Sequence, residues 1–482
     1  MNLRIAKVIA KEEWRYWGRS KLGIAASITV GVLVIVSLVS TFVRMESERE
    51  SRESFQTNAT ETFESQPARH PHRMVHYGHY VFREPAPMAV IDPGVDAYTG
   101  TAMFLEGHRQ NSAVFSPRYA SAHLGPFADL SPAFAYQVLV PLLLIVLGFG
   151  AMPREREGKT DYLLLSSSVS GSDLWLGKTL ALAGAMAAAL IPLALALLLA
   201  ISSGESAVVA IYFLLGYLAY LLVWVLVISA VSAWMRNASA SFSLLLAVWV
   251  VFCVIVPRFA ASTAQLTSPM VGKIASDFAV LEAVRNLGDG HNANDPAFAA
   301  LRAQLLEQYD VDDVADLPIN FRGVVAETAE ANLTEVLNEF AEEKMAEELA
   351  QAQVVHWLGI LSPTLAIRSF SVMTAGTDVR QYHTFLREAE RVRFEFVQAL
   401  NSVHARELSY TVDMQRSVDE ASERRTRVSP SHWRVGHVGW QPPSTGQRIT
   451  NGLLQLFALM AWAILAAFLG LRGINVGARE HG

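Results

Sequence analysis

Four of the histidines in the 482-residue chain lie within ten residues of one another, at His70, His72, His76 and His79. Imidazole nitrogens bind Zn²⁺ and Cu²⁺, so this group is a candidate metal site. However, the spacing matches no closed zinc motif, and histidine-rich tracts are often only a feature of composition. We therefore favour hydrogen-bonded structural histidines and expect the chain to bind no cofactor, with the metal site as the alternative.

Two short stretches look like the end of a phosphate-binding loop. They are Gly158-Lys159-Thr160 and Gly177-Lys178-Thr179. The full loop also needs a glycine five positions before the second glycine. Those positions hold Pro153 and Ser172, and neither stretch follows a strand. We therefore expect the chain itself not to bind ATP.

The sequence carries no recognisable catalytic motif. It has no HExxH helix and no G-x-S-x-G elbow, and its one cysteine, Cys253, lies within an apolar run. The formal net charge of −6 supplies no basic excess for binding nucleic acid. An enzyme and a nucleic-acid-binding protein are therefore both disfavoured.

The composition indicates a membrane protein. Hydrophobic residues make up 52% of the chain and charged residues only 17%, whereas soluble proteins carry roughly 25% charged residues. About 20 consecutive apolar residues cross a bilayer core as a helix. Six runs meet this requirement: residues 22–43, 133–152, 179–201, 207–231, 241–260 and 451–471. We predict an α-helical polytopic membrane protein with six transmembrane helices.

Basic residues predict which ends of these helices face the cytoplasm. Lys and Arg are frequent in residues 1–21 and 153–178, and they recur in the tail, 472–482. Because cytoplasmic loops carry the excess of Lys and Arg, both termini are expected inside the cell. The long segments 44–132 and 261–450 are then two extracytoplasmic domains. Residues 3–20 have the pattern of an amphipathic helix lying on the inner leaflet.

The six runs hold no Asp, Glu, Lys, Arg or His before Arg258, near the end of the fifth. Ion-coupled transporters use such intramembrane groups as relays and counter-ions. Secondary transport is therefore disfavoured, and any transport needs another source of energy.

The two outer segments differ in pattern. In 44–132, a charged, Ser-rich start as far as Pro67 predicts a flexible stalk. Asp92-Pro93-Gly94 is a turn sequence in which Gly94 is free to take a positive φ, and the segment is expected to combine short strands and helix. Segment 261–450 is Ala- and Glu-rich with helical periodicity. It is expected to be mainly helical, with a break at Gly376 and Asp378 before a helix at 381–407.

The loop of residues 153–178 contains the stretch EREGKTDYLLLSSSVSGSDLWLGK. This stretch resembles the inner loop of ABC-2 type permeases, the membrane subunits of one class of ABC exporter. The chain departs from the family pattern at Ser168, where proline is common, and at Lys159, inserted between two pattern positions. The residues at pattern positions are Glu155, Arg156, Glu157, Gly158, Thr160, Leu164, Leu165, Ser167, Val169, Ser170, Gly177 and Lys178.

Two stretches of the outer segments look like signatures of one subfamily of these permeases. They read HYGHYVFREPAPMAVIDPGVDAYTGTAMFLEGHRQN and LSPTLAIRSFSVMTAGTDVRQYHTFLREAERVRFEFVQALN. That subfamily carries a domain of unknown function and is commonly encoded beside an ATPase and a sister permease. The signature residues that we single out are His79, Asp92, Pro93, Gly94, Gly100, His108, Gln110, Asn111, Ser362, Pro363, Gly376 and Asp378.

The resemblance implies a permease subunit, for export or for mechanical signalling, in the bacterial inner membrane. A separate cytoplasmic ABC ATPase dimer would bind ATP and Mg²⁺ and contact the 153–178 loop and the 3–20 helix, including Glu13 and Arg15. A second permease subunit, identical or a sister chain, would complete the pathway. A periplasmic or lipoprotein partner is a further candidate. The alternative is a membrane-anchored extracytoplasmic scaffold or sensor without transport activity.

Overall fold

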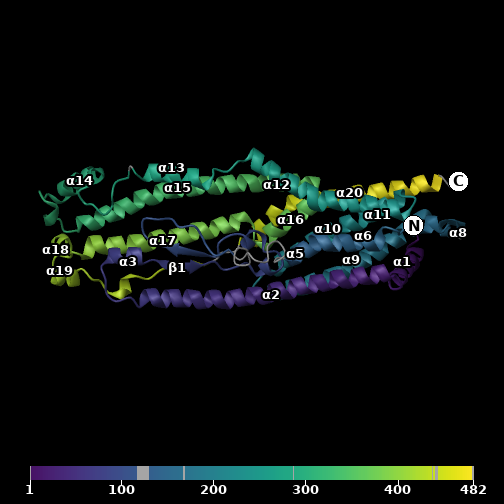
Figure 1. Cartoon of the computed structure of the whole chain (residues 1–482), viewed down its shortest axis with the longest axis horizontal. Coiled ribbons are helices and arrows are strands. Elements are labelled where there is room, and N and C mark those ends of the chain that lie inside the picture. The colour runs from purple at the N-terminus through teal and green to yellow at the C-terminus, as the bar shows by residue number, and fades with distance from the viewer. Residues whose placement is uncertain are drawn as a thin grey trace.

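The computed structural model describes residues 2–116, 130–166, 169–285, 287–436, 438–439 and 443–479. The molecule is long and almost entirely helical, with most helices running along its length (Figure 1). Both ends of the chain lie at the same end of the molecule, beside the apolar helices (Figure 1). The opposite half, which we call the distal lobe, contains residues 45–116 and 268–436 apart from α16.

Within the described residues, six helical segments are long and apolar enough to cross a membrane. The chain thus has the helices of a multi-pass membrane protein. Short π-helical turns interrupt the second and the fifth segments, at Ala135–Leu139 and Val251–Ile255. The segments are α2 (Lys21–Glu64), α5 to α7 (Pro132–Phe134, Val140–Gly148 and Pro153–Glu157), α9 (Gly171–Ser202), α10 (Ala207–Trp234), α11 and α12 (Ala238–Val250 and Val256–Thr267) and α20 (Thr445–Arg479).

Helix α2 runs on past residue 43, where the first apolar run ends. It continues to Glu64, so the predicted flexible stalk is instead helical. At 1.5 Å per residue, its 44 residues extend roughly 66 Å, about twice the hydrocarbon core of a bilayer. Pairs such as Arg49–Glu53, at 3.0 Å, support the charged part, and Phe63 is buried against Phe396 of the distal lobe.

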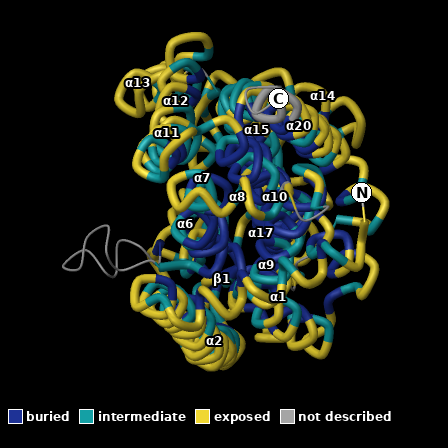
Figure 2. The backbone as a smooth tube through the Cα atoms, turned by 90° about the vertical axis from the view of Figure 1, so that its right-hand side faces the viewer, coloured by how far each residue is buried: buried dark blue, intermediate teal, exposed yellow. Residues whose placement is uncertain are grey.

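The core of the bundle surrounds α10, whose Phe213, Tyr217 and Trp224 are buried, whereas α2 lies at the rim with most of its surface exposed (Figure 2). Helix α16 (Pro363–Ala375) belongs to the segment predicted to lie outside, yet it packs against α10 and α20. The absence of a side chain at Gly216 makes room for the Phe370 ring. Part of segment 261–450 is therefore embedded in the bundle.

The distal lobe combines a small sheet with long helices. Strands β1 (His79–Phe82) and β2 (Ala102–Leu105) pair antiparallel, with His79 opposite Leu105. Helices α15 and α17 lie side by side along the lobe (Figure 1). The helices of the lobe, apart from single 3₁₀ turns, are α3 (Pro71–Tyr77), α13 (Lys273–Val284), α14 (Ala299–Tyr309), α15 (Phe321–Leu358), α17 (Val379–Glu407), α18 (Tyr410–Gln415) and α19 (Glu420–Arg425).

The predicted helix break occurs between α16 and α17. Gly376 ends α16 in the left-handed conformation, with φ 74°, and the Asp378 side chain caps α17 by accepting from Gln381 N at 3.3 Å. Helix α17 begins at Val379, two residues before the expected start.

Candidate functional site

Helix α1 (Leu3–Trp17) is amphipathic and packs against α9. The two helices approach closely at Gly177, where a Cβ atom would lie 2.6 Å from Ile9 Cβ. Trp17 is buried, and its indole N–H donates to the Leu147 carbonyl at 2.9 Å. The N-terminal helix is therefore fixed to two of the apolar helices by packing and by a hydrogen bond.

A partly buried group of charges, which we call the Glu13 cluster, joins α1, α7 and α9. Its members are Glu13, Arg154, Glu155 and Lys178. Lys178 donates to Glu13 and, at 2.6 Å, to Glu155, while Arg154 also donates to Glu13. The Lys178 and Glu13 side chains are only 6% and 4% exposed. Residues from three helices thus form one site in which positive and negative charges balance.

Three residues singled out from the sequence meet in this cluster: Glu13, Glu155 and Lys178. Arg154 was missed, although it neighbours Glu155. Arg15 does not take part, because it pairs with Glu12 on the exposed face of α1.

Helix α7 is held at the junction of α10 and α11. Arg156 donates to the carbonyl of Ala233, at 2.7 Å, and to that of Met235. Glu157 accepts from Ala238 N, the first residue of α11, at 2.9 Å. A cation at a helix C-terminus and an anion at a helix N-terminus satisfy backbone groups that the helices leave open. Arg156 and Glu157 therefore fix the position of α7.

The predicted 153–178 loop is largely helical. After Gly158, helix α8 (Thr160–Ser166) exposes Tyr162 and Leu163, at 71% and 65%. The Thr160 hydroxyl donates to Glu155, and Leu164 is half-buried. The capping box of Ser170 and Asp173 starts α9 at Gly171, earlier than the sequence predicted. Ser167 and Ser168, and the side chain of Leu165, lie outside what the structure describes.

The two signature stretches meet where α16 enters the bundle. Asp92 is buried and accepts from the Ser371 hydroxyl, and Thr377 Oγ1 donates to the Asp92 carbonyl at 3.0 Å. Burial raises the pKa of the Asp92 carboxyl, because it disfavours the charged form. Ser362, with Pro363 next to it, caps α16 and donates to the Phe252 carbonyl at 3.2 Å. These residues attach the distal lobe to the bundle.

Gly94 in this junction has the positive φ that the turn predicts, at 51°, and a Cβ atom there would lie 2.3 Å from the Thr377 carbonyl oxygen. We expect Gly94→Ala to lower the free energy of unfolding by about 2–4 kcal/mol, from backbone strain and overpacking. Thermal unfolding in detergent tests this. Gly31→Ala, at a helical site with nothing within 4 Å, is the control and should cause no loss; equal stability of the two variants would refute the expectation.

The other signature residues of the first stretch hold the turns around β2. Gly100 follows the turn that Pro93 begins and lies against the backbone of Ala113, leaving no room for a side chain. Asn111 donates to the Phe104 carbonyl at 3.0 Å, and Gln110 donates to Asn338 of α15 at 3.1 Å.

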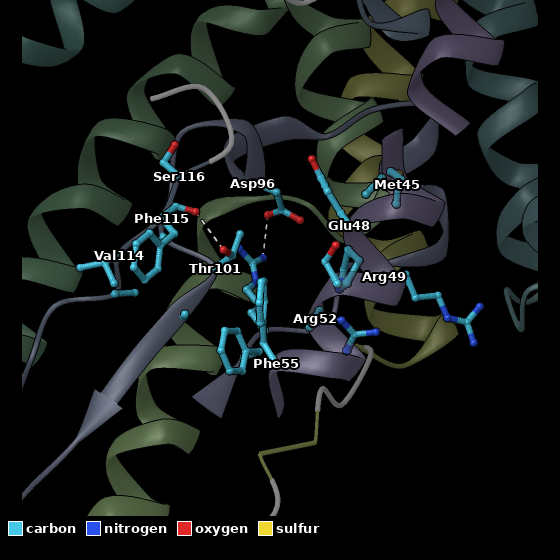
Figure 3. A pocket seen from close by; sticks show the side chains of 18 of the residues that line it. Met45, Glu48, Arg49, Arg52, Phe55, Asp96, Thr101, Val114, Phe115 and Ser116 are labelled. Carbon is cyan, nitrogen blue, oxygen red and sulfur yellow. Dashed lines mark hydrogen bonds and ion pairs between the residues drawn. The ribbon is translucent and has the colours of Figure 1, made fainter. Parts of the chain in front are cut away.

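A cavity of about 1230 Å³ lies between the charged part of α2 and the sheet (Figure 3). Its walls combine aromatic rings, such as Phe55 and Phe115, with arginines of α2, such as Arg49 and Arg52. Arg83 and Asp96 pair on its wall at 2.6 Å. Burial nevertheless raises the pKa of Asp96 to about 6. No motif in the sequence pointed to this cavity.

The structure divides the four histidines that the sequence grouped. His70 Nε2 lies 3.0 Å from Asp413 Oδ1, beside His404, and burial lowers the pKa of His70 to about 4. His79 packs against Phe63, and burial lowers its pKa to about 4 as well. The set of four is therefore not a single site.

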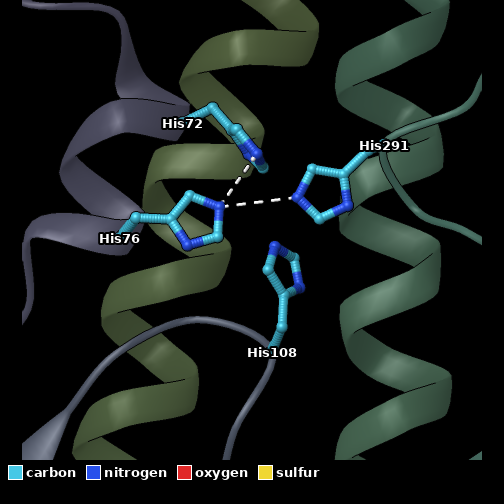
Figure 4. A group of neighbouring side chains, drawn as sticks. All are labelled: His72, His76, His108 and His291. Atoms are coloured by element: carbon cyan, nitrogen blue, oxygen red, sulfur yellow. Dashed lines mark hydrogen bonds between the residues drawn. The ribbon is translucent and has the colours of Figure 1, made fainter.

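Only His72 and His76 of that set come together. They meet two histidines from elsewhere, His108 and His291 (Figure 4). His108 was singled out from the sequence only as a signature residue. His291 was missed, because it stands 215 positions after His76 and carries no local motif.

Residues 276–436 match the family model described as Domain of unknown function (DUF3526). The match covers about a third of the chain and lies within the distal lobe and α16. It includes Asp378 and His291 but none of the Glu13 cluster. No curated protein matches the chain.

Proposed function

We propose that the chain is the membrane permease subunit of an ABC-2 type transporter, driven by separate ATPase subunits at the end of the bundle that carries α1, α7 and α8. This end is cytoplasmic in the proposal, and the distal lobe is extracytoplasmic. The observation that carries the proposal is the Glu13 cluster. It connects the two elements that the sequence resemblance assigns to ATPase contact, and it does so on α9, an apolar helix that enters the bundle.

The coupling in this proposal is mechanical. Helix α7 is bound to the ends of α10 and α11, and α1 is bound to α9. A partner that displaces α8 therefore pushes on several apolar helices together. Rigid-body and shear motions of packed helices are a common way to transmit such a displacement. At the other end, Asp92 and Ser371 connect the bundle to the distal lobe, so the movement reaches that lobe.

A second permease subunit, identical or a sister chain, belongs to the proposal. Helix α13 lies beyond the fifth apolar segment, yet Ile274, Phe278 and Leu281 are 74%, 68% and 60% exposed on one face. Their i, i+4, i+7 spacing is typical of a helix that packs against a partner. This stripe supports subunit contact outside the membrane.

The cavity beside α2 favours an amphiphilic cargo, such as a lipid or a lipopeptide. Its apolar walls would accept the acyl chains of such a molecule, and the arginines of α2 would face an anionic headgroup. The cavity lies next to the exposed apolar surface of α2, from which a lipid could enter.

Helix α8 offers the cleanest test of ATPase docking. Tyr162→Glu combined with Leu163→Glu places charges on an exposed apolar surface, whereas a change at Glu157 would also remove its hydrogen bond to the first residue of α11. We expect ATPase activity to co-purify with the tagged chain from native membranes, and the double variant to retain at least tenfold less of it. Val418→Glu, at an 88% exposed site in the distal lobe, is the control.

Two outcomes would contradict the proposal. If no ATP hydrolysis co-purifies with the unaltered chain, the transporter assignment fails. If the double variant retains as much activity as Val418→Glu, docking through α8 fails.

A further inference from the structure

Four imidazole rings converge in the distal lobe from three separate segments (Figure 4). His72 and His76 stand one turn apart on α3, His108 follows β2, and His291 lies in the turns before α14. Each ring offers a nitrogen, and these four nitrogens all lie within 4.8 Å of one another. His108 adopts a left-handed backbone conformation, with φ 63°, which is uncommon for a residue other than glycine.

Hydrogen bonds between the rings do not account for this arrangement. His76 Nε2 lies 3.2 Å from His72 Nε2 and 3.5 Å from His291 Nε2. An imidazole nitrogen carries either one proton or one lone pair, so it can satisfy only one of these two contacts. Four nitrogens bound at 2.0–2.1 Å around a tetrahedral ion would be about 3.3–3.4 Å apart. The separations of 3.2 and 3.5 Å bracket that value.

Carboxylates hold the Nδ1 atoms of two of the four rings, His108 and His291. His108 Nδ1 lies 2.9 Å from Glu330 Oε2, and His291 Nδ1 lies 3.0 Å from Asp289 Oδ1. Such a carboxylate accepts the Nδ1 proton and leaves the Nε2 lone pair facing inward, as it does for the histidine ligands of metal sites. His108 Nε2 is buried and has no hydrogen-bond partner among the described residues.

The carboxylate behind His108 is itself held in place. Glu330 is fully buried on α15, and Arg393 of α17 donates to it while also bonding Glu390 and Thr334. The Glu330 carboxylate also accepts from the backbone N–H of His108 at 3.0 Å. The orientation of the His108 ring is therefore set by a buried network that reaches the two long helices of the lobe.

We propose that His72, His76, His108 and His291 bind one Zn²⁺ ion. Four neutral imidazole nitrogens suit Zn²⁺, which is intermediate between hard and soft metal ions and accepts tetrahedral coordination. They fill all four positions and leave none open for catalysis. The ion is therefore structural. It fixes the turns before α14 to α3 and thereby connects the two outer segments of the chain at a point distant from the bundle.

The test is zinc binding by the full chain, purified in detergent, stripped with a chelator and titrated with Zn²⁺ alone. We expect one ion per chain by elemental analysis, and a tetrahedral absorption spectrum when Co²⁺ replaces it. His291→Ala and His76→Ala should each weaken binding by at least tenfold. Asp289→Asn should weaken it by about 10–100-fold, the usual effect of losing a supporting carboxylate.

His432→Ala is the matched control, because His432 lies elsewhere in the lobe and pairs with Glu407. It should bind zinc like the unaltered chain. Because the His291 side chain is half exposed on a turn, its replacement should leave thermal unfolding of the stripped protein unchanged. Two results would overturn the proposal. The first is equal zinc content in the His291→Ala, His76→Ala and His432→Ala variants, which would mean an adventitious ion only. The second is absence of zinc binding to the unaltered chain.

Discussion

Replacing Lys178 by methionine is expected to destabilise the protein and to loosen α1 from the bundle. The substitution leaves the buried carboxylate of Glu13 and the half-buried carboxylate of Glu155 without their shared cation, although Arg154 still pairs with both. Removing one partner from a buried ion pair costs about 3–5 kcal/mol of stability. We expect a loss near the lower end of this range, because Arg154 still compensates part of the negative charge. Thermal unfolding in detergent measures the loss, and limited proteolysis of residues 3–17 measures the release of α1.

Lys273→Met is the matched control. Lys273 pairs with Asp277, but its side chain is 80% exposed, so the change should lie within about 1 kcal/mol of zero. Adding Glu13→Gln to Lys178→Met should recover part of the lost stability, because it removes one of the uncompensated charges. If Lys178→Met is as stable as Lys273→Met, and α1 is equally resistant to protease, the cluster does not attach α1 to the bundle.

Features that depend on neighbouring residues could be predicted from the sequence. Apolar runs long enough to span a bilayer located the six helical segments, and a Gly followed by an Asp two residues later located the break between α16 and α17. Gly94 has the predicted positive φ. In each case the cause is local, namely helix length, a capping side chain or a backbone conformation that glycine tolerates.

Long-range contacts explain the errors. The stretch after residue 43 looks like a stalk because it is charged and Ser-rich, but the distal lobe supports it through Phe63. Helix α16 lies beyond the fifth apolar run, and long-range contacts such as the packing of Phe370 against Gly216 place it inside the bundle. The pairing of Glu13 with Lys178 spans 165 positions, so the resemblance named both residues without indicating that they touch.

A further buried ion pair, between Arg448 and Glu205, fixes α16 to the apolar helices. Arg448, near the start of α20, forms two hydrogen bonds with Glu205, at 2.8 and 2.9 Å, in the turn between α9 and α10. Its Nε donates to the Thr374 carbonyl, near the end of α16, at 2.7 Å. Both charged side chains are 3% exposed. One guanidinium therefore connects the α9–α10 turn, α16 and α20.

We expect Arg448→Met to lower the free energy of unfolding by about 3–5 kcal/mol, because it leaves the Glu205 carboxylate buried and unpaired. Adding Glu205→Leu should restore most of that loss, since apolar side chains of similar volume often replace a buried pair at little cost. Arg391→Met, which removes an exposed arginine paired with Glu388 and Glu395, is the control and should change stability by about 1 kcal/mol or less. Thermal unfolding of the four proteins in one detergent gives the comparison. A double variant no more stable than Arg448→Met would show that the cost comes from lost packing of α16 and not from the unpaired charge.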